Sequence, residues 1–428
     1  MPRAMNHDPH PSSPSSDDHP LLRQEAARCV ACGLCLPHCP TYRKTLNEAD
    51  SPRGRIFLMA ALLEHKLTLS PELVGHMDLC LTCRACENAC PSKVRYGQLA
   101  DGVRALIEPE RQRPMRQRAL RRVLFKTLAS PRLLQGAGAL LGAYQRSGLQ
   151  GLARQSRLLE ALGLSRAEAR LPPLSAPPRS GMHPAHGTPR GTVGLFLGCV
   201  ARLSDAETLH AAVFVLNRLG YAVQVAPRQT CCGALHEHSG ERETAQRLAQ
   251  ENRTVFAGLD LQAIVHTASG CGATLAEYAP PLAAPVLDIS TFLAAAEGWE
   301  QVALAPLEQI IAVHEPCLSR NVLHDQDAPY ALLRRIPGAT VMALAGNDQC
   351  CGAAGIYAVT QPEMAGKLLR DKIDAIKTGG AHTIATSNPG CAMHLADGLQ
   401  AEGWEVEVLH PVTLVARQMG YMKPKNLS

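Results

Sequence analysis

The sequence predicts an α+β multidomain protein, in which a small helical domain precedes two duplicated α/β domains. Three observations lead to this fold class. A four-cysteine run occurs twice between residues 29 and 91, a proline-rich stretch lies near residue 175, and a cysteine-containing unit is repeated beyond it. With 428 residues, the chain is long enough for two or three domains with an ample hydrophobic core.

The two cysteine runs share the spacing C-x2-C-x2-C-x3-C-P. The first has Cys29, Cys32, Cys35 and Cys39, and the second has Cys80, Cys83, Cys86 and Cys90. This is the bacterial ferredoxin pattern, in which three cysteines hold one [4Fe-4S] cluster and the fourth reaches the other cluster. Two-residue steps let three thiolates converge on a cube, and the final proline stops the outgoing segment from folding back. We therefore expect a helical two-[4Fe-4S] ferredoxin-type domain that transfers single electrons.

Cross-ligation predicts which cysteines share a cluster. The first set is Cys29, Cys32, Cys35 and Cys90, and the second set is Cys80, Cys83, Cys86 and Cys39. An exchange of the two fourth cysteines is an open alternative. Zinc is another, because paired C-x2-C units also form sites of four thiolates. Two such pairs already complete a zinc site, however, so zinc binding does not explain the additional C-x2-C spacing within each run.

Cysteine usage predicts a cytoplasmic protein. The 16 cysteines are clustered in metal-like spacings, and thiolates that bind iron must stay reduced. Residues 1–20 are rich in Pro, Ser and His and lack the apolar stretch of a secretory signal, so they should form a disordered tail. No run approaches the roughly 20 apolar residues that span a bilayer. Any contact with the inner face of the cell membrane would therefore be peripheral.

The ferredoxin-like domain should occupy residues 21–110, with helices over 21–28, 56–63, 71–79 and 96–107. Several cations lie close to the cysteines in sequence, namely Arg53, Arg55, Arg84, Lys93 and Arg95. A cation beside a cluster raises its reduction potential by stabilising the added electron. Solvation and helix capping explain any single one of them equally well.

Residues 111–190 should contain a basic helix followed by a linker with six prolines between residues 171 and 190. Leu120, Val123, Leu124 and Leu128 fall at helical spacing among the arginines. This stripe either faces the core beneath a solvated basic face, or the helix docks on an acidic partner or anionic lipid. Nucleic acid is not an expected partner, because aromatic residues are only 4% of the chain and none interleaves with these arginines.

Beyond the linker, a unit of about 115 residues occurs twice, which indicates duplication of one domain. The copies are expected at 191–300 and 301–420. Each copy has four cysteines, two of them in a Cys-Cys-Gly motif, and equivalent cysteines are offset by 118 to 120 residues. They are Cys199, Cys231, Cys232 and Cys271 in the first copy, and Cys317, Cys350, Cys351 and Cys391 in the second.

Apolar, β-rich runs alternate with amphipathic helices in both copies, which predicts two α/β Cys-Cys-Gly domains. The expected strands are 193–197, 221–225, 263–267, 309–313, 340–344 and 383–386. Most cysteines follow a strand directly, at the carboxyl edge where α/β sheets gather ligands. Vicinal thiols do not easily close a disulfide, yet both can bind metal, and the next glycine permits a tight turn. Each copy is therefore a candidate third or fourth metal site, for a further iron-sulfur cluster or for zinc.

Three histidines lie near these cysteines in sequence, namely His236, His238 and His314. A lone histidine is more often structural than a ligand. We therefore leave all three outside the predicted ligand sets.

Together, these motifs resemble the iron-sulfur subunit of glycolate oxidase, also called glycolate dehydrogenase. The resemblance runs from about residue 25 to 418 and includes the stretches 52–56, 80–87, 268–272 and 350–358. The same superfamily includes subunits of lactate oxidation complexes, anaerobic glycerol-3-phosphate dehydrogenase and heterodisulfide reductase, and an equivalent subunit of one of these complexes is the alternative within this class. In heterodisulfide reductase relatives, each copy has a fifth cysteine three residues before the last, where this chain has Ala268 and Asn388.

The resemblance implies an oxidoreductase subunit of glyoxylate metabolism. In that family, a separate FAD-bearing subunit oxidises glycolate to glyoxylate, and the iron-sulfur subunit passes the electrons toward quinone or another respiratory acceptor. This chain would then carry no catalytic residue of its own, and we find no GxGxxG that opens a helix after a strand. The alternative of another class is a zinc-bound scaffold that assembles flavin subunits without carrying electrons.

Overall fold

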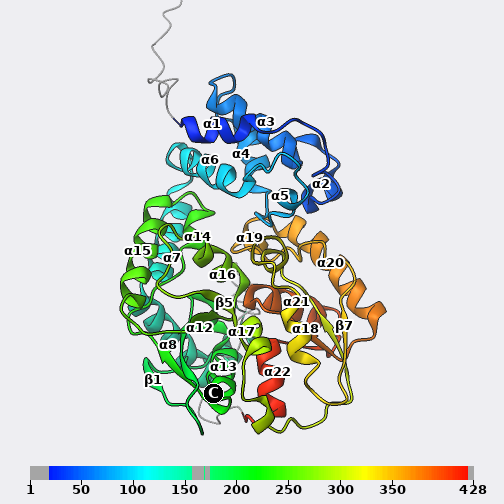
Figure 1. Cartoon of the computed structure of the whole chain (residues 1–428). Helices are drawn as coiled ribbons and strands as arrows, with labels where there is room; N and C mark the ends of the chain where they lie inside the picture. The colour runs from blue at the N-terminus through cyan, green and yellow to red at the C-terminus, as the bar shows by residue number, and fades with distance from the viewer. Residues whose placement is uncertain (1–18, 157–167, 169–173, 423–428) are drawn as a thin grey trace, which may run out of the picture.

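The computed structural model describes residues 19–156, 168 and 174–422. Most of the predicted tail over 1–20 and part of the proline-rich stretch lie outside the described residues. A small helical domain lies at one end of the molecule, and two α/β domains lie side by side beneath it (Figure 1). The predicted fold class is thus confirmed.

The first domain consists of short helices around the two cysteine runs. They are α1 (Pro20–Ala27), α2 (Pro40–Thr45), η1 (Glu48–Asp50), α3 (Pro52–Leu63), α4 (Pro71–Asp78), α5 (Ala85–Asn88) and α6 (Tyr96–Glu110). A serine precedes the first proline of both α3 and α4. The side chains of Ser51 and Ser70 accept hydrogen bonds from the backbone N–H groups of Gly54 and Leu73, so both helices begin at a capped proline.

The core of the first domain lies between α3, α4 and α6. Met59, Leu99 and Val103 have no exposed surface. The same apolar cluster includes Cys86, and four more cysteines pack against it, namely Cys29, Cys35, Cys80 and Cys90. The packing of this domain is therefore coupled to the state of its cysteines.

Three helices follow, α7 (Met115–Ala129), α8 (Pro131–Arg146) and α9 (Leu149–Gln155). The basic helix is present as α7, but most of its apolar stripe does not face the core. Leu120 and Val123 are 70% and 63% exposed, whereas Phe125 is only 3% exposed. The Phe125 ring meets the ring of His236 edge-on, with 5.0 Å between centroids. Phe125 therefore holds α7 to the first Cys-Cys-Gly domain, and the stripe at Leu120 and Val123 faces solvent.

The first Cys-Cys-Gly domain has a five-stranded sheet in the order β1-β3-β2-β4-β5. Its strands are β1 (Gly181–His183), β2 (Gly191–Phe196), β3 (Tyr221–Val225), β4 (Ala263–His266) and β5 (Val286–Asp288). Its helices are α12 (Val200–Ser204), α13 (Ala206–Arg218), α14 (Ala234–Glu237), α15 (Arg242–Phe256), α16 (Ser269–Ala276), α17 (Ile289–Ala295) and η2 (Trp299–Gln301). β1 pairs with β3 antiparallel, so the sheet begins within the 111–190 segment in which we expected only a helix and a linker.

The second Cys-Cys-Gly domain has a four-stranded parallel sheet in the order β7-β6-β8-β9. Its strands are β6 (Ile310–Val313), β7 (Thr340–Ala343), β8 (Thr383–Ala385) and β9 (Glu407–Leu409). Its helices are the π-helical turn η3 (Ser319–Leu323), α18 (Ala328–Leu333), α19 (Tyr357–Thr360), α20 (Pro362–Gly379), α21 (Pro389–Ala401) and α22 (Pro411–Gln418). Apart from β1, the two sheets share one strand order, as the duplication predicts.

One hydrophobic cluster is shared by the two copies, in addition to a separate cluster in each copy. Leu216 of α13 and Val412 of α22 are fully buried in one cluster that also contains strand residues from both sheets. The hydroxyls of Thr208 and Thr413 are 3.1 Å apart at this contact. No residue of the helical domain belongs to this cluster. The paired sheets therefore have a core that does not depend on the first domain.

Candidate metal centres

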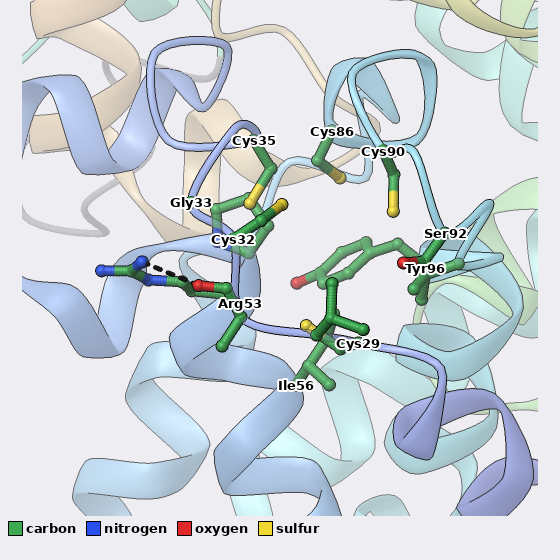
Figure 2. A pocket seen from close by; sticks show the side chains of 14 residues that line it. Cys29, Cys32, Gly33, Cys35, Arg53, Ile56, Cys86, Cys90, Ser92 and Tyr96 are labelled. Atoms are coloured by element: carbon green, nitrogen blue, oxygen red, sulfur yellow. Dashed lines mark hydrogen bonds between the residues drawn. The ribbon is translucent and has the colours of Figure 1, made fainter.

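The first cavity lies between the two cysteine runs (Figure 2). Its thiols are those of Cys29, Cys32, Cys35, Cys86 and Cys90. Figure 2 shows their sulfur atoms around one space, with the Tyr96 ring on one side of it. Gly33 has a φ of 83°, which lets the loop turn between the second and third cysteines. Burial raises the pKa of the Cys35 thiol to about 11, so a bound cation is needed to make it a thiolate ligand at neutral pH.

The second cavity lies directly beside the first, because Cys86 and Tyr96 line both. Its other thiols are those of Cys39, Cys80 and Cys83. Cys39 belongs to the first run, but it lies among cysteines of the second, and Cys90 lies among those of the first. This is the grouping that cross-ligated clusters require.

Arg55 supplies a buried positive charge to the second cavity. Its side chain is 1% exposed, and its Nη1 lies 4.0 Å from the Cys39 Sγ. The guanidinium also donates to Thr41 Oγ1 at 3.1 Å and to the His76 carbonyl at 2.7 Å, and the Asp50 carboxylate lies 3.8 Å away. These bonds hold the cation in one position against the cysteines.

The Cys80 thiol responds to this charge. Burial by itself would raise its pKa, but Arg55 and Arg104 outweigh the burial, and the pKa lies below its usual value. Arg104 donates to the Cys80 carbonyl at 2.8 Å and to Thr82 Oγ1 at 2.7 Å. Arg55 was among the predicted cations, whereas Arg104, which lies on α6 beyond the second cysteine run, was not.

We expect Arg55→Gln to lower the reduction potential of the cluster in the second cavity by roughly 50 to 100 mV. One charge about 7 Å away contributes about 2 kcal/mol at an effective dielectric constant near 20, and a tenfold change in a one-electron equilibrium is about 59 mV. Asp50 offsets part of the effect. A redox titration followed by electron paramagnetic resonance (EPR) measures the shift. Arg55→Lys keeps the charge and should stay near the wild-type potential, and equal shifts in both variants would contradict the electrostatic explanation.

The first Cys-Cys-Gly site gathers its four thiols at the carboxyl edge of the first sheet, as predicted. The Sγ atoms of Cys231 and Cys199 are 3.4 Å apart, and Cys232 is hydrogen bonded to Cys271. Gly233 has a φ of 92°, which allows the turn after the vicinal cysteines. Hydrogen bonding and burial raise the pKa of Cys199, so without metal this thiol is neutral.

The second Cys-Cys-Gly site is built in the same way, and a histidine is added to it. Sγ distances are 3.9 Å between Cys317 and Cys350, and 3.4 Å between Cys351 and Cys391. Ligand atoms of His314, Cys351 and Cys391 all lie within 4.8 Å of one another. Hydrogen bonds from Cys317 and Cys351 hold the pKa of Cys350 well below its usual value, with a further contribution from Lys372. The site can thus present at least one thiolate to a metal.

The other two histidines serve in packing. His236 is fully buried and its Nε2 lies 3.2 Å from the Phe125 carbonyl. His238 Nδ1 lies 3.0 Å from the Asp101 carboxylate, and the two form an ion pair between the first domain and the first Cys-Cys-Gly domain. Both histidines therefore have identified structural partners.

The second cavity borders the second Cys-Cys-Gly site. Cys83, Cys317 and Cys350 belong to one apolar cluster, together with Leu81 and Tyr357. Two hydrogen bonds hold the contact, from the Tyr357 hydroxyl to the Leu79 carbonyl at 2.9 Å and from Asn321 Nδ2 to the Cys83 carbonyl at 2.8 Å. Burial and the neighbouring Cys350 thiolate raise the pKa of Cys83. Sequence reasoning did not find this contact, because its residues lie more than 230 positions apart.

Comparison with known proteins covers both parts of the chain. A family model described as a 4Fe-4S dicluster domain matches residues 25–94, and one described as a cysteine-rich domain matches residues 193–276 and 311–396. A third, described as the linker region of the glycolate oxidase iron-sulfur subunit, matches residues 116–171. Apart from Tyr96, the residues that line the cavities thus fall within the matched 4Fe-4S dicluster domain.

Two relatives are similar to nearly the whole chain. The protein named probable glycolate oxidase iron-sulfur subunit from Bacillus subtilis is 35% identical over 420 residues, which cover 93% of this chain and 95% of the relative. The glycolate oxidase iron-sulfur subunit of Escherichia coli is 34% identical, with 86% and 89% covered. Lactate utilization protein A of Shouchella clausii is 27% identical, but covers only 51% of this chain.

Proposed function

Because the chain belongs to the family of glycolate oxidase iron-sulfur subunits, we propose that it relays single electrons from an FAD-containing subunit, which oxidises glycolate to glyoxylate, to a quinone or another respiratory acceptor. The chain is the iron-sulfur subunit of an oxidoreductase. The observation that carries the proposal is the pair of adjacent cavities that share Cys86 and Tyr96. Neighbouring one-electron centres can divide the electron pair of a reduced flavin into single steps.

We infer that two [4Fe-4S] clusters are held in these cavities. Cys29, Cys32, Cys35 and Cys90 would hold one, and Cys39, Cys80, Cys83 and Cys86 the other. The lining of the cavities supports this grouping, and Cys86 is assigned to the second cluster because its run supplies the other two thiols there. The clusters supply reversible one-electron chemistry. The chain holds them, surrounds the first with the apolar side chains of Ile56 and Val94, and presents Arg55 to the second.

Anaerobic reduction by glycolate tests the relay. The purified chain is mixed with its flavin subunit, and the brown cluster absorbance should bleach when glycolate is added. About eight irons per chain would correspond to the two ferredoxin-type sites, and about sixteen would add a cluster in each Cys-Cys-Gly copy. Flavin reduction without bleaching would contradict the relay, and zinc in place of iron would support the scaffold alternative.

The alternative within the same class is a subunit that serves lactate. It rests on the 27% identity with lactate utilization protein A over half of this chain. The same mixture, with lactate in place of glycolate, separates the two, because only the substrate of the flavin partner should bleach the clusters.

We further propose that the chain contacts the inner face of the cell membrane through α7 and α8. Leu120, Val123 and Leu124 form an exposed apolar arc on α7, and the exposed cations Arg116 and Lys126 flank it at helical spacing. Residues 111–156 contain no Asp or Glu. A basic amphipathic surface of this kind suits anionic lipid, since each cation near the headgroups contributes about 1 kcal/mol. Within the described residues, no helix has the length and apolar character needed to cross a bilayer.

Co-sedimentation with vesicles tests this contact. The chain should pellet with phosphatidylcholine vesicles that contain phosphatidylglycerol, less at high salt, and little with phosphatidylcholine alone. Replacing Leu120 and Val123 together with aspartate should weaken binding at least about tenfold, because both apolar side chains lose their burial in lipid. Val359→Asp is the matched control, since Val359 is 76% exposed on α19. Equal pelleting of all three proteins would rule out the α7 surface.

A further inference from the structure

The two Cys-Cys-Gly sites descend from one unit, but two buried positions beside their thiols differ. Three residues before the first cysteine of each copy, the first copy has Phe196 and the second has His314. The glycine of each Cys-Cys-Gly motif packs on an alanine, Gly233 on Ala245 and Gly352 on Ala365. The residue seven positions after this alanine is Asn252 in the first copy and Lys372 in the second. Both changes replace a neutral side chain with a nitrogen base or a cation.

His314 has an unused nitrogen beside the second site. The residue is 1% exposed and follows β6 directly. Its Nδ1 lies 2.9 Å from Thr386 Oγ1, which fixes the ring, and its backbone N–H donates to the Ala385 carbonyl at 2.9 Å. Its Nε2 is buried and has no hydrogen-bond partner among the described residues. An unpaired buried polar atom costs about 1 to 3 kcal/mol, which a metal bond would offset.

The neighbours of the His314 imidazole are thiols. Ligand atoms of His314, Cys351 and Cys391 lie within 4.8 Å of one another, and the Cys317 thiol donates a hydrogen bond to Cys350 Sγ at the same site. The first copy has Phe196 at the position of His314. Since Phe196 is 2% exposed and well packed there, the fold does not require an imidazole at this position.

Lys372 brings a buried amine to the second site. Its side chain is 2% exposed, its Nζ donates to the Gly346 carbonyl at 2.5 Å, and its charge acts on the thiols of Cys350 and Cys351. A buried ammonium needs a negative partner, and thiolates on a metal provide one. Asn252 is instead occupied with backbone groups, the Thr230 N–H at 2.9 Å and the Cys231 carbonyl at 3.0 Å.

We propose that the second Cys-Cys-Gly site is a metal centre of mixed ligation, in which His314 Nε2 binds beside three thiolates from the set Cys317, Cys350, Cys351 and Cys391, whereas the first site offers thiolates only. This inference goes beyond the proposed function and stands whether or not glycolate is the electron donor. The metal is one that accepts both cysteine and histidine, either zinc or the iron of an iron-sulfur cluster. Iron would make this site the neighbour of the cluster at Cys83, and a neutral histidine in place of a thiolate would raise its potential.

Metal analysis of His314 variants tests the ligand assignment. Iron, acid-labile sulfide and zinc are counted in the full chain after anaerobic purification. His314→Phe, which reproduces the residue of the first copy, should lose the metal of one site. His314→Cys should keep that metal through a sulfur ligand. His236→Phe changes a buried histidine that lies away from the thiols of the second site and should keep the full count.

Spectroscopy then identifies the nitrogen ligand directly. If the metal is iron, pulsed EPR of the reduced centre should show a nitrogen coupling that changes with ¹⁵N-histidine labelling and is absent from His314→Cys. If the metal is zinc, X-ray absorption should show one nitrogen at about 2.0 to 2.1 Å that the same variant lacks. The proposal is overturned if His314→Phe keeps the wild-type count and spectrum, or if Cys391→Ser changes no metal count.

Discussion

Replacing Cys83 with serine is expected to remove one [4Fe-4S] cluster, about four irons per chain, and to slow acceptor reduction at least about 100-fold. Changes outside the ligand set of a metal already cost about 10- to 100-fold, and this change removes a ligand. Cys83 lines the second cavity and packs with Cys317 and Cys350, so the variant also disrupts the contact with the second Cys-Cys-Gly site. Iron analysis and stopped-flow kinetics with the flavin subunit measure both effects.

The flavin half of the reaction provides the internal control for this prediction. Reduction of FAD by glycolate should keep its wild-type rate, since that step does not involve this chain. Ala89→Ser adds a hydroxyl in the same cysteine run without removing a thiol and should retain all irons. Wild-type acceptor reduction by Cys83→Ser, with its irons lost, would show that electrons do not pass through this cluster.

Removal of iron is expected to unfold the helical domain while the paired sheets stay folded. Five cysteines of the first domain belong to its core cluster or pack on it, so loss of the clusters leaves buried thiols around two cavities. Structural metal sites contribute on the order of 10 kcal/mol to folding, more than a domain of this size can replace. The core shared by α13 and α22 contains no residue of that domain.

Hydrogen–deuterium exchange before and after anaerobic chelation measures this effect. Protection should be lost in α3 and α6 and retained in β2, β4 and β6. Retained protection in α3 and α6 after complete iron loss would show that the helical domain folds without its clusters. Simultaneous loss in all five elements would show that the sheets depend on it as well.

Most elements could be predicted because their signals are local. The six predicted strands correspond to β2, β3, β4, β6, β7 and β8, each a run of apolar or β-branched residues. Three short strands were not predicted. β1 lies within the proline-rich segment and joins the sheet only by antiparallel pairing at its edge, and β1, β5 and β9 are each three residues long. A run of three residues has too little periodicity to indicate a strand.

The orientation of α7 shows where pattern alone fails. Helical spacing grouped Leu120, Val123, Leu124 and Leu128, but it could not say which side of the helix has a neighbour. Phe125 makes the inward contact, with the Arg121 guanidinium 4.5 Å from its ring centroid. A single large aromatic side chain meets His236 and sets the rotation of the helix, so the predicted stripe lies mostly in solvent.

For the metal sites, the sequence by itself determined the candidate thiols. Cysteines only two or three residues apart must lie close together in any fold, so their spacing alone indicates a shared site. The sequence also determined the family, since the two runs and the duplicated Cys-Cys-Gly units are read directly from residue order. Tertiary structure decided the electrostatics and the connections: Arg104 at Cys80, Lys372 at Cys350, and Cys83 beside the second Cys-Cys-Gly site. These contacts join segments that lie far apart in the chain, so residue spacing cannot predict them. Burial also strengthens the electrostatic effect of each cation on its neighbouring thiol.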